Sequence, residues 1–159
     1  MNIAIGCDDA AVKLKEELVN HLVSLGHDYT DYSDAINDES NLYPDIAERT
    51  ARAVAENKHD RGIIVCGTGI GVSIVANKVP GIRAALCHDV FSAVRARKSN
   101  GAQIITMGER VIGVELAKTI LEHWLAADDV DPSSQPKVQR IMDIEEKLLN
   151  QEGEEYASA

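Results

Sequence analysis

The sequence predicts an α/β fold, a three-layer α/β/α sandwich built on a five-stranded parallel sheet. The first observation behind it is that five short apolar runs alternate with longer segments whose apolar residues recur at helical spacing. The second is the length of 159 residues, which suits one domain with a substantial core. The third is that 45% of the residues are hydrophobic but only one is Phe and one is Trp, so the core is aliphatic. Such alternation of strands and helices favours parallel βαβ units.

The first half of the chain carries clear signals for the ends of its elements. The pair Asp8–Asp9 follows the first apolar run and can cap a helix that Gly26 ends. A polar connection over 33–41 follows a weaker second strand, and the segment Tyr43–Asp45, with its proline, opens the next helix. These signals predict strands at 2–7, 27–32 and 62–66, and helices at 10–25 and 45–57.

Turns divide the second half in the same way. A Pro-Gly turn at 80–81, a Ser-Asn-Gly turn at 99–101 and a polar loop at 128–136 separate the apolar segments. We therefore expect strands at 82–87 and 103–107, and helices from the glycine loop to about 79, from 88 to about 98, at 114–127 and at 137–150. The domain covers 1–150, its last helix presents an apolar side suited to a partner subunit, and 151–159 form a frayed tail.

Charge and composition exclude several classes of function. The formal net charge of -10, from 26 acidic and 16 basic residues, repels nucleic acid and anionic membranes but leaves a small anionic substrate possible. The N-terminal segment has no apolar run of signal or membrane length, so we expect a soluble, cytoplasmic protein. Three cysteines at 7, 66 and 87 fit neither a disulfide framework nor a zinc site, and no motif for a metal or a cofactor is present.

The glycine-rich stretch after the third strand is the main candidate for chemistry. It reads Cys66-Gly67-Thr68-Gly69-Ile70-Gly71, and its third glycine comes one residue too early for a dinucleotide fingerprint. Glycines let a backbone approach a ligand, and the N–H groups of such a loop attract anions. They would also stabilise a Cys66 thiolate, which could remove a proton from a carbon acid. The alternative is that these glycines serve only the geometry of the turn.

Other candidates follow from the rule that ligands bind beyond the carboxyl ends of parallel strands. Asp8–Asp9, His88 and the segment Gly108–Arg110 all come directly after predicted strands. Asp8 and Asp9 could cap the first helix or bind substrate hydroxyls, and His88 could line the site. Asn100 precedes a strand, so its spacing places it on the opposite side of the sheet.

Five stretches of the sequence together resemble one known family. They are IAIGCDDA, LYPD, GIIVCGTGIGVSIVANKVPGIRAALCHD, SNGAQIITMGERVIG and ELAKTI. These stretches closely resemble the type B ribose-5-phosphate isomerase family, which includes galactose-6-phosphate isomerase subunits, over about Asn2 to Ile144. The resemblance implies a Rossmann-like sheet, a metal-free and cofactor-free aldose–ketose isomerase, and a homodimer or homotetramer whose active sites are shared between subunits.

The resemblance also implies roles for individual residues. Cys66 would shuttle a proton between C1 and C2 of the sugar, and the loop Gly67 to Gly71 would hold the enediolate oxygen with help from Thr68. Sugar oxygens would contact Asp8, Tyr43 and Asn100, and the phosphate would bind Arg110 and Lys137. The resulting prediction is a catalytic group of Cys66, Thr68 and Asp8 and a substrate-binding group of Asp9, Tyr43, Gly67, Gly69, Gly71, His88, Ser99, Asn100, Arg110 and Lys137.

The chain departs from the family pattern at positions that bear on the substrate. Asp9 and Ser99 stand where the family commonly has histidines, and Ser133 and Lys137 stand where it has arginines. A tetrose 4-phosphate cannot close a five-membered ring, so its isomerase needs no ring-opening acid at position 99. The resemblance implies ribose 5-phosphate and ribulose 5-phosphate as the default substrate pair, and Ser99 is compatible with the alternative pair, erythrose 4-phosphate and erythrulose 4-phosphate. A nucleotide-binding regulatory domain would explain the glycines but not Cys66.

Overall fold

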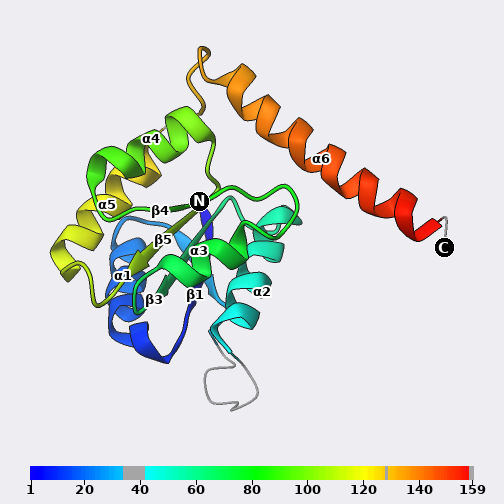
Figure 1. The fold of residues 1–159 in the computed structure, drawn as a ribbon. Helices are drawn as coiled ribbons and strands as arrows, with labels where there is room; N and C mark the ends of the chain where they lie inside the picture. Colours follow the sequence, from blue (N-terminus) through cyan, green and yellow to red (C-terminus); the bar gives the residue numbers. More distant parts are fainter. Residues whose placement is uncertain (34–41, 128, 158–159) are drawn as a thin grey trace.

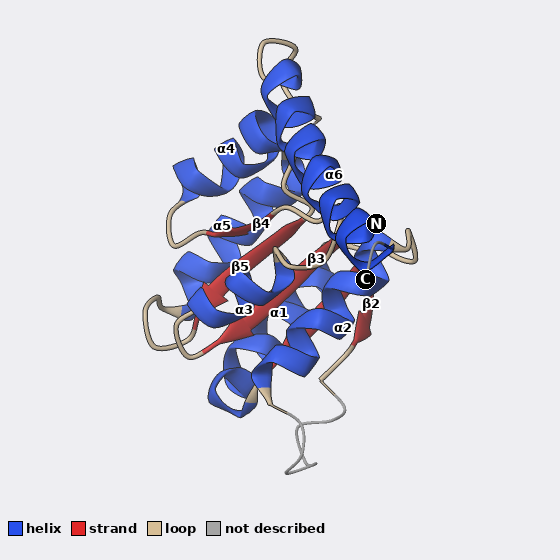
Figure 2. Ribbon diagram, turned by 45° about the vertical axis from the view of Figure 1, so that its right-hand side comes forward, coloured by secondary structure: helices blue, strands red, loops and turns tan. Residues whose placement is uncertain are grey.

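The structure, a computed structural model, describes residues 1–33, 42–127 and 129–157. Its five strands form one parallel sheet in the order β2-β1-β3-β5-β4. Figure 2 shows the strands in red between the helices. The strands are β1 (Asn2–Cys7), β2 (Asp28–Asp31), β3 (Arg61–Cys66), β4 (Ala84–Leu86) and β5 (Ile104–Gly108). The predicted parallel sheet is thereby confirmed, while the predicted connection at 33–41 lies, apart from Ser33, outside the described residues.

Helices cover both faces of the sheet and complete the three layers (Figure 1). One face packs against α1 (Val12–Ser24), which follows a short 3-10 turn (Asp9–Ala11), and against α4 (Val90–Asn100) and α5 (Val114–Ala126). The other face packs against α2 (Tyr43–Ala55) and α3 (Ile70–Ala76). Successive side chains of a strand point to opposite faces. Cys66 therefore faces α2 and α3, whereas Cys7 and Cys87 lie in the core on the α1 side.

Helix α3 and strand β4 have other ends than predicted, and one asparagine side chain links them. The helix ends at Ala76 rather than near Val79, and the strand covers only Ala84–Leu86 rather than 82–87. Asn77 directs its carboxamide at the outer edge of β4, where Oδ1 accepts from Ala84 N at 2.9 Å and Nδ2 donates to Ala84 O at 2.8 Å. This side chain holds the helix end against the edge strand.

The C-terminal helix α6 (Gln135–Ala157) differs most from its predicted form. It begins before Lys137 and continues past Asn150, so 151–157 are helical where a frayed tail was predicted; no proline interrupts this stretch. Figure 1 shows α6 leading away from the three layers. It is tied to them by bonds from the Arg83 guanidinium to Met142 Sδ and from Gly81 N to the Glu145 carboxylate. Its apolar residues Ile141, Ile144, Leu148 and Leu149 are each more than 40% exposed.

Candidate active site

The glycine loop turns back on the sulfur of Cys66. Gly69 adopts a left-handed conformation with φ of 77°, which glycine reaches without strain. This turn brings Gly69 N to 3.0 Å from Cys66 Sγ, and its N–H donates to the sulfur. A main-chain N–H directed at a thiol stabilises the thiolate over the thiol. Cys66 is 6% exposed, so its thiol is shielded from bulk water.

Strand β5 supports the loop from below. Thr106 Oγ1 donates to Gly69 O at 3.0 Å. A side chain at Gly69 would lie 2.8 Å from the main-chain carbonyl carbon of Met107, and one at Gly108 would lie 2.6 Å from that of Thr68. Both contacts are closer than real side chains allow, so the loop sits directly on the backbone of β5. Thr106 is not among the predicted site residues, although a lone polar residue in an apolar strand is a visible signal in the sequence.

Tyr43 lies against the same loop from the start of α2. A side chain added to Gly71 would meet the Tyr43 ring at 2.7 Å, so the phenol occupies the space that this glycine leaves open. Helix α2 begins at Tyr43 rather than at Asp45 because the Asp45 carboxylate accepts from Leu42 N at 2.9 Å and caps the first turn. Tyr43 is 44% exposed and Thr68 is exposed, so both can reach a bound molecule.

Arg110 and Asp8 complete the cluster at this edge of the sheet. The Arg110 guanidinium lies 3.4 Å from where a side chain on Gly67 would begin, and Arg110 N donates to Gly67 O at 3.0 Å. Asp8 directly follows β1 and caps the 3-10 turn, with Oδ1 accepting from Ala10 N. Burial raises the pKa of Asp8, and the nearby Arg110 opposes that rise. A cation over the loop favours an anionic ligand, while Asp8 offers oxygens to hydroxyl groups.

The other two residues predicted at strand ends have different surroundings. Asp9 is exposed in the first turn after β1. His88 is half-buried, and its Nε2 accepts from Gly108 N at 3.0 Å. Burial lowers the pKa of His88 below its ordinary value, and Asp89 raises it by a smaller amount. The imidazole is therefore neutral at pH 7, and one of its nitrogens is committed to the backbone of β5.

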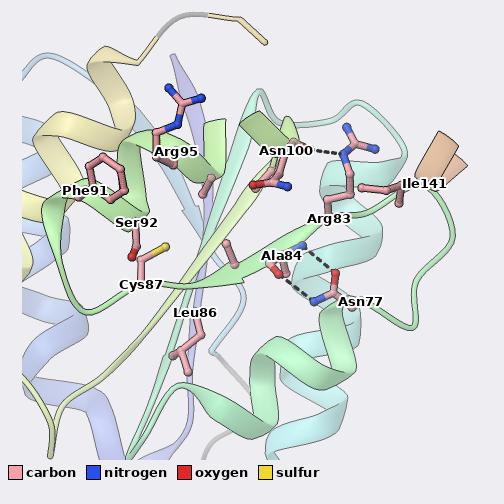
Figure 3. Close-up of a pocket in the computed structure, with 13 residues that line it drawn as sticks. Asn77, Arg83, Ala84, Leu86, Cys87, Phe91, Ser92, Arg95, Asn100 and Ile141 are labelled. Atoms are coloured by element: carbon pink, nitrogen blue, oxygen red, sulfur yellow. Dashed lines mark hydrogen bonds between the residues drawn. The ribbon is translucent and has the colours of Figure 1, made fainter. Parts of the chain in front are cut away.

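Three predicted substrate contacts lie away from Cys66 within one chain. Ser99 and Asn100 end α4, at the amino edge of the sheet, as the spacing of Asn100 predicts. Figure 3 shows Asn100 beside Arg83, whose Nε donates to Asn100 O at 2.9 Å. The two residues line a groove between β4, α4 and Ile141 of α6. Lys137 is exposed in the first turn of α6.

The remaining cysteines have no comparable surroundings. Cys7 is fully buried and Cys87 is 2% exposed, and burial raises the pKa of each thiol to about 11. Among the described residues, no group of three His, Cys, Asp or Glu side chains is arranged to hold a metal ion. Across the same residues, no helix combines the length and apolarity needed to cross a membrane.

Comparison with known proteins gives consistent matches. Residues 3–141 match the family model described as Ribose/Galactose Isomerase. The chain is 54% identical over 141 residues to the D-erythrulose-4-phosphate isomerase of Pectobacterium atrosepticum, covering 89% of this chain and 93% of that one. It is 49% identical over 147 residues to the ribose-5-P isomerase B of Listeria innocua, covering 92% of this chain and 99% of that one. The solved ribose-5-phosphate isomerase B of Clostridium thermocellum superimposes with a TM-score of 0.88 at 42% identity, covering 93% and 99%.

Proposed function

The chain belongs to the ribose/galactose isomerase family and is an aldose–ketose isomerase of sugar phosphates, and we propose that Cys66 is the base that moves the proton. The observation that carries this proposal is the 3.0 Å bond from Gly69 N to Cys66 Sγ, in a loop against which the Arg110 guanidinium lies. Family membership favours this reading over a nucleotide-binding regulatory domain, which would leave the thiol unexplained.

The proposed reaction needs one base and a set of hydrogen-bond donors. The Cys66 thiolate takes the proton from C2 of the aldose, and the electrons of that bond form an enediolate whose negative charge lies on O1. The Cys66 thiol then returns the proton to C1 while the proton of the O2 hydroxyl passes to O1, which leaves the ketone at C2 and regenerates the thiolate. The oxygen that becomes negative during this step would be held by N–H groups of the Gly67–Gly71 loop and by the Thr68 hydroxyl. Asp8 and Tyr43 would orient the sugar hydroxyls, with Asp9 at the rim, and Arg110 would bind the phosphate.

We further propose that the site is completed by a second copy of the chain in a homodimer or homotetramer. Ser99, Asn100 and Lys137 lie away from Cys66 in their own chain. Asn100 lines a groove, and Lys137 belongs to helix α6, whose apolar residues Ile141 and Ile144 are exposed. A partner subunit that covers these surfaces would place its own glycine loop beside Asn100 of this chain. Lys137 of this chain would then join the residues that bind the phosphate in the partner's site. Three free thiols fit a reducing compartment, so the proposed location is the cytoplasm.

The proposed substrate pair is erythrose 4-phosphate and erythrulose 4-phosphate. Ser99 is a hydroxyl that does not donate a proton as an acid at neutral pH, so the chain offers no ring-opening acid at that position. A tetrose 4-phosphate needs none, because its O4 carries the phosphate. The similarity to a protein named D-erythrulose-4-phosphate isomerase supports this choice, while the ribose-5-P isomerase B match keeps the pentose as the competing substrate.

A substrate panel tests the proposal. The purified protein would be assayed with four-, five- and six-carbon aldose phosphates, and kcat/KM would be compared. We expect the highest value for erythrose 4-phosphate. An equal or higher value for ribose 5-phosphate would assign the pentose pair instead, and no turnover of any sugar phosphate would overturn the proposed reaction.

A further inference from the structure

We propose that His88 is a positioning residue for the catalytic loop, acting through a hydrogen bond to the end of β5 rather than through contact with substrate. The inference deepens the proposed isomerase function and rests on it. It starts from the place where β4 leaves the sheet. The paired residues of β4 and β5 end at Leu86 and Thr106, and the last main-chain bond between them runs from Cys87 N to Thr106 O at 3.0 Å.

Beyond that bond, the imidazole replaces a backbone acceptor. In an unbroken parallel ladder, Gly108 N would donate to the carbonyl of Cys87. Here Gly108 N donates to His88 Nε2 at 3.0 Å. A main-chain N–H can only donate, so Nε2 must be unprotonated and the neutral ring must carry its proton on Nδ1. The side chain of His88 therefore extends the pairing of β5 by one bond after the backbone of β4 has turned away.

Gly108 is the residue through which this bond reaches the active site. It pairs in register with Cys66, and its Cα faces the main chain of Thr68, where a side chain would come within 2.6 Å. Its carbonyl accepts from Val111 N at 3.0 Å, in the turn that carries Arg110. A shift of Gly108 would therefore move Thr68 and Arg110 together. A fixed Gly108 therefore fixes the positions of both the Thr68 main chain and Arg110.

The charged and titratable groups around this bond come from three elements. Asp89 follows His88 and caps α4, with its carboxylate accepting from Ser92 N at 2.7 Å. Glu109 and Arg110 follow Gly108, and Cys66 ends β3. Glu109 accepts from Leu14 N at 2.9 Å, so its carboxylate is occupied at the start of α1. None of these groups accepts the hydrogen bond that Gly108 N donates to His88 Nε2.

Two substitutions separate positioning from contact. In His88→Gln the side-chain oxygen can reach the place of Nε2, whereas in His88→Asn it stops short. We expect His88→Asn to lower kcat roughly 10- to 100-fold with KM changed by less than about threefold, because small displacements of reacting groups have effects of that size. We expect His88→Gln to recover most of the loss. His123→Gln, on the exposed side of α5, is the matched control and should keep wild-type kinetics.

Other outcomes would overturn the inference. Equal loss in both variants together with a raised KM would make His88 a direct substrate contact, and unchanged kcat in His88→Asn would leave it without a role. Nitrogen-15 NMR of the wild-type imidazole gives a readout independent of turnover and of variant folding. An unprotonated Nε2 is expected, and a protonated Nε2 would refute the bond. Failure of the proposed function is distinguishable, because wild-type protein would then turn over no sugar phosphate at all.

Discussion

The carboxyl ends of β1 and β3 lie side by side, and each ends on a cysteine, yet only one of them has the surroundings of an active site. Cys7 pairs in register with Val65, one residue before Cys66. Since successive side chains alternate between faces, the two sulfurs point to opposite sides of the sheet. Cys7 lies in the core beneath α1, and Cys66 lies beside the loop that precedes α3.

The main-chain donors at the two ends are used differently. After β1 the chain satisfies them with its own carboxylates, because Ala10 N donates to Asp8 and Leu14 N donates to Glu109. After β3 the Gly69 N–H is directed at the sulfur of Cys66, and Ile70 N donates to the Thr68 hydroxyl at 3.4 Å. A thiol at a strand end is therefore not enough for reactivity. What distinguishes Cys66 is an N–H group that the loop geometry aims at it.

The largest expected effect comes from removing each thiol in turn. Cys66→Ala should lower kcat/KM by about 10²- to 10⁴-fold, the usual contribution of a positioned base. Cys7→Ala should leave kcat/KM within about threefold, because that sulfur lies in the core on the α1 side of the sheet, opposite to Cys66. Steady-state kinetics with the preferred sugar phosphate would decide the matter, and similar losses in both variants would remove the distinction between the two strand ends.

Alkylation should show the same difference without mutation. Burial raises the pKa of Cys7 and of Cys87 to about 11, so at pH 8 only about one in a thousand of each is a thiolate. Iodoacetamide should therefore modify one cysteine per chain, Cys66, with loss of activity in parallel. Peptide mass spectrometry identifies the site, and early modification of Cys7 would contradict the assignment.

A smaller effect is expected where β5 supports the loop. In Gly108→Ala the new side chain would meet the main chain of Thr68 at 2.6 Å, which no rotamer change relieves. We expect a loss of about 1–3 kcal/mol of stability from overpacking and a lower kcat. Gly113→Ala is the control, since nothing lies within 4 Å of the added carbon there. Thermal unfolding and kinetics of both variants would be compared. Equal melting temperatures and equal kcat values would mean that the backbone of β5 does not constrain the glycine loop.

The smallest effect is expected from the ion pair between Lys15 and Asp31, near the carboxyl end of β1. Lys15 Nζ lies 2.6 Å from Asp31 Oδ2, near Cys7. Burial raises the pKa of Asp31, but hydrogen bonds from Lys15 and Ser33 outweigh it and the net pKa is lowered. Stability from this pair is therefore present above the ordinary pKa of Asp, about 4, and is lost as the pH falls below it.

Lys15→Met tests that pair. It should reduce the free energy of unfolding by about 0.5–1 kcal/mol at pH 7, a modest value because the pair is partly exposed to screening water. The difference from wild type should shrink below pH 4, and kcat should not change. Denaturant titrations at pH 7 and pH 3 would measure this. A pH-independent difference would mean that packing of the lysine stem, rather than its charge, supports the end of β1.

Much of the fold and of the site could be predicted because both depend on local patterns. Alternating apolar runs predicted the five parallel strands, and the rule for their carboxyl ends brought Asp8, Cys66 and Arg110 to one edge, where the structure places them. The faces of the thiols could not be predicted, since they depend on register between strands far apart in sequence. Thr106 was missed because its partner, the Gly69 carbonyl, is set by the shape of the loop.

The predicted ends of α2 and α3 were also wrong, and both errors have the same cause. The stop of α3 depends on the Asn77 carboxamide bonding to Ala84, and the start of α2 on the Asp45 carboxylate bonding to Leu42 N. Both depend on the direction of one polar side chain. Hydrophobic spacing carries no information about that direction, so it located the helices and misplaced their ends.

The bond between Asn77 and Ala84 also bears on how the protein behaves at high concentration. β4 is the outermost strand on its side, and an outer strand normally offers unpaired N–H and C=O groups to any other extended chain. Asn77 presents a donor and an acceptor to Ala84 as a neighbouring strand would, and β4 is only three residues long. Little of this edge is left to recruit another strand, so the sheet is protected against growth into aggregates on the β4 side.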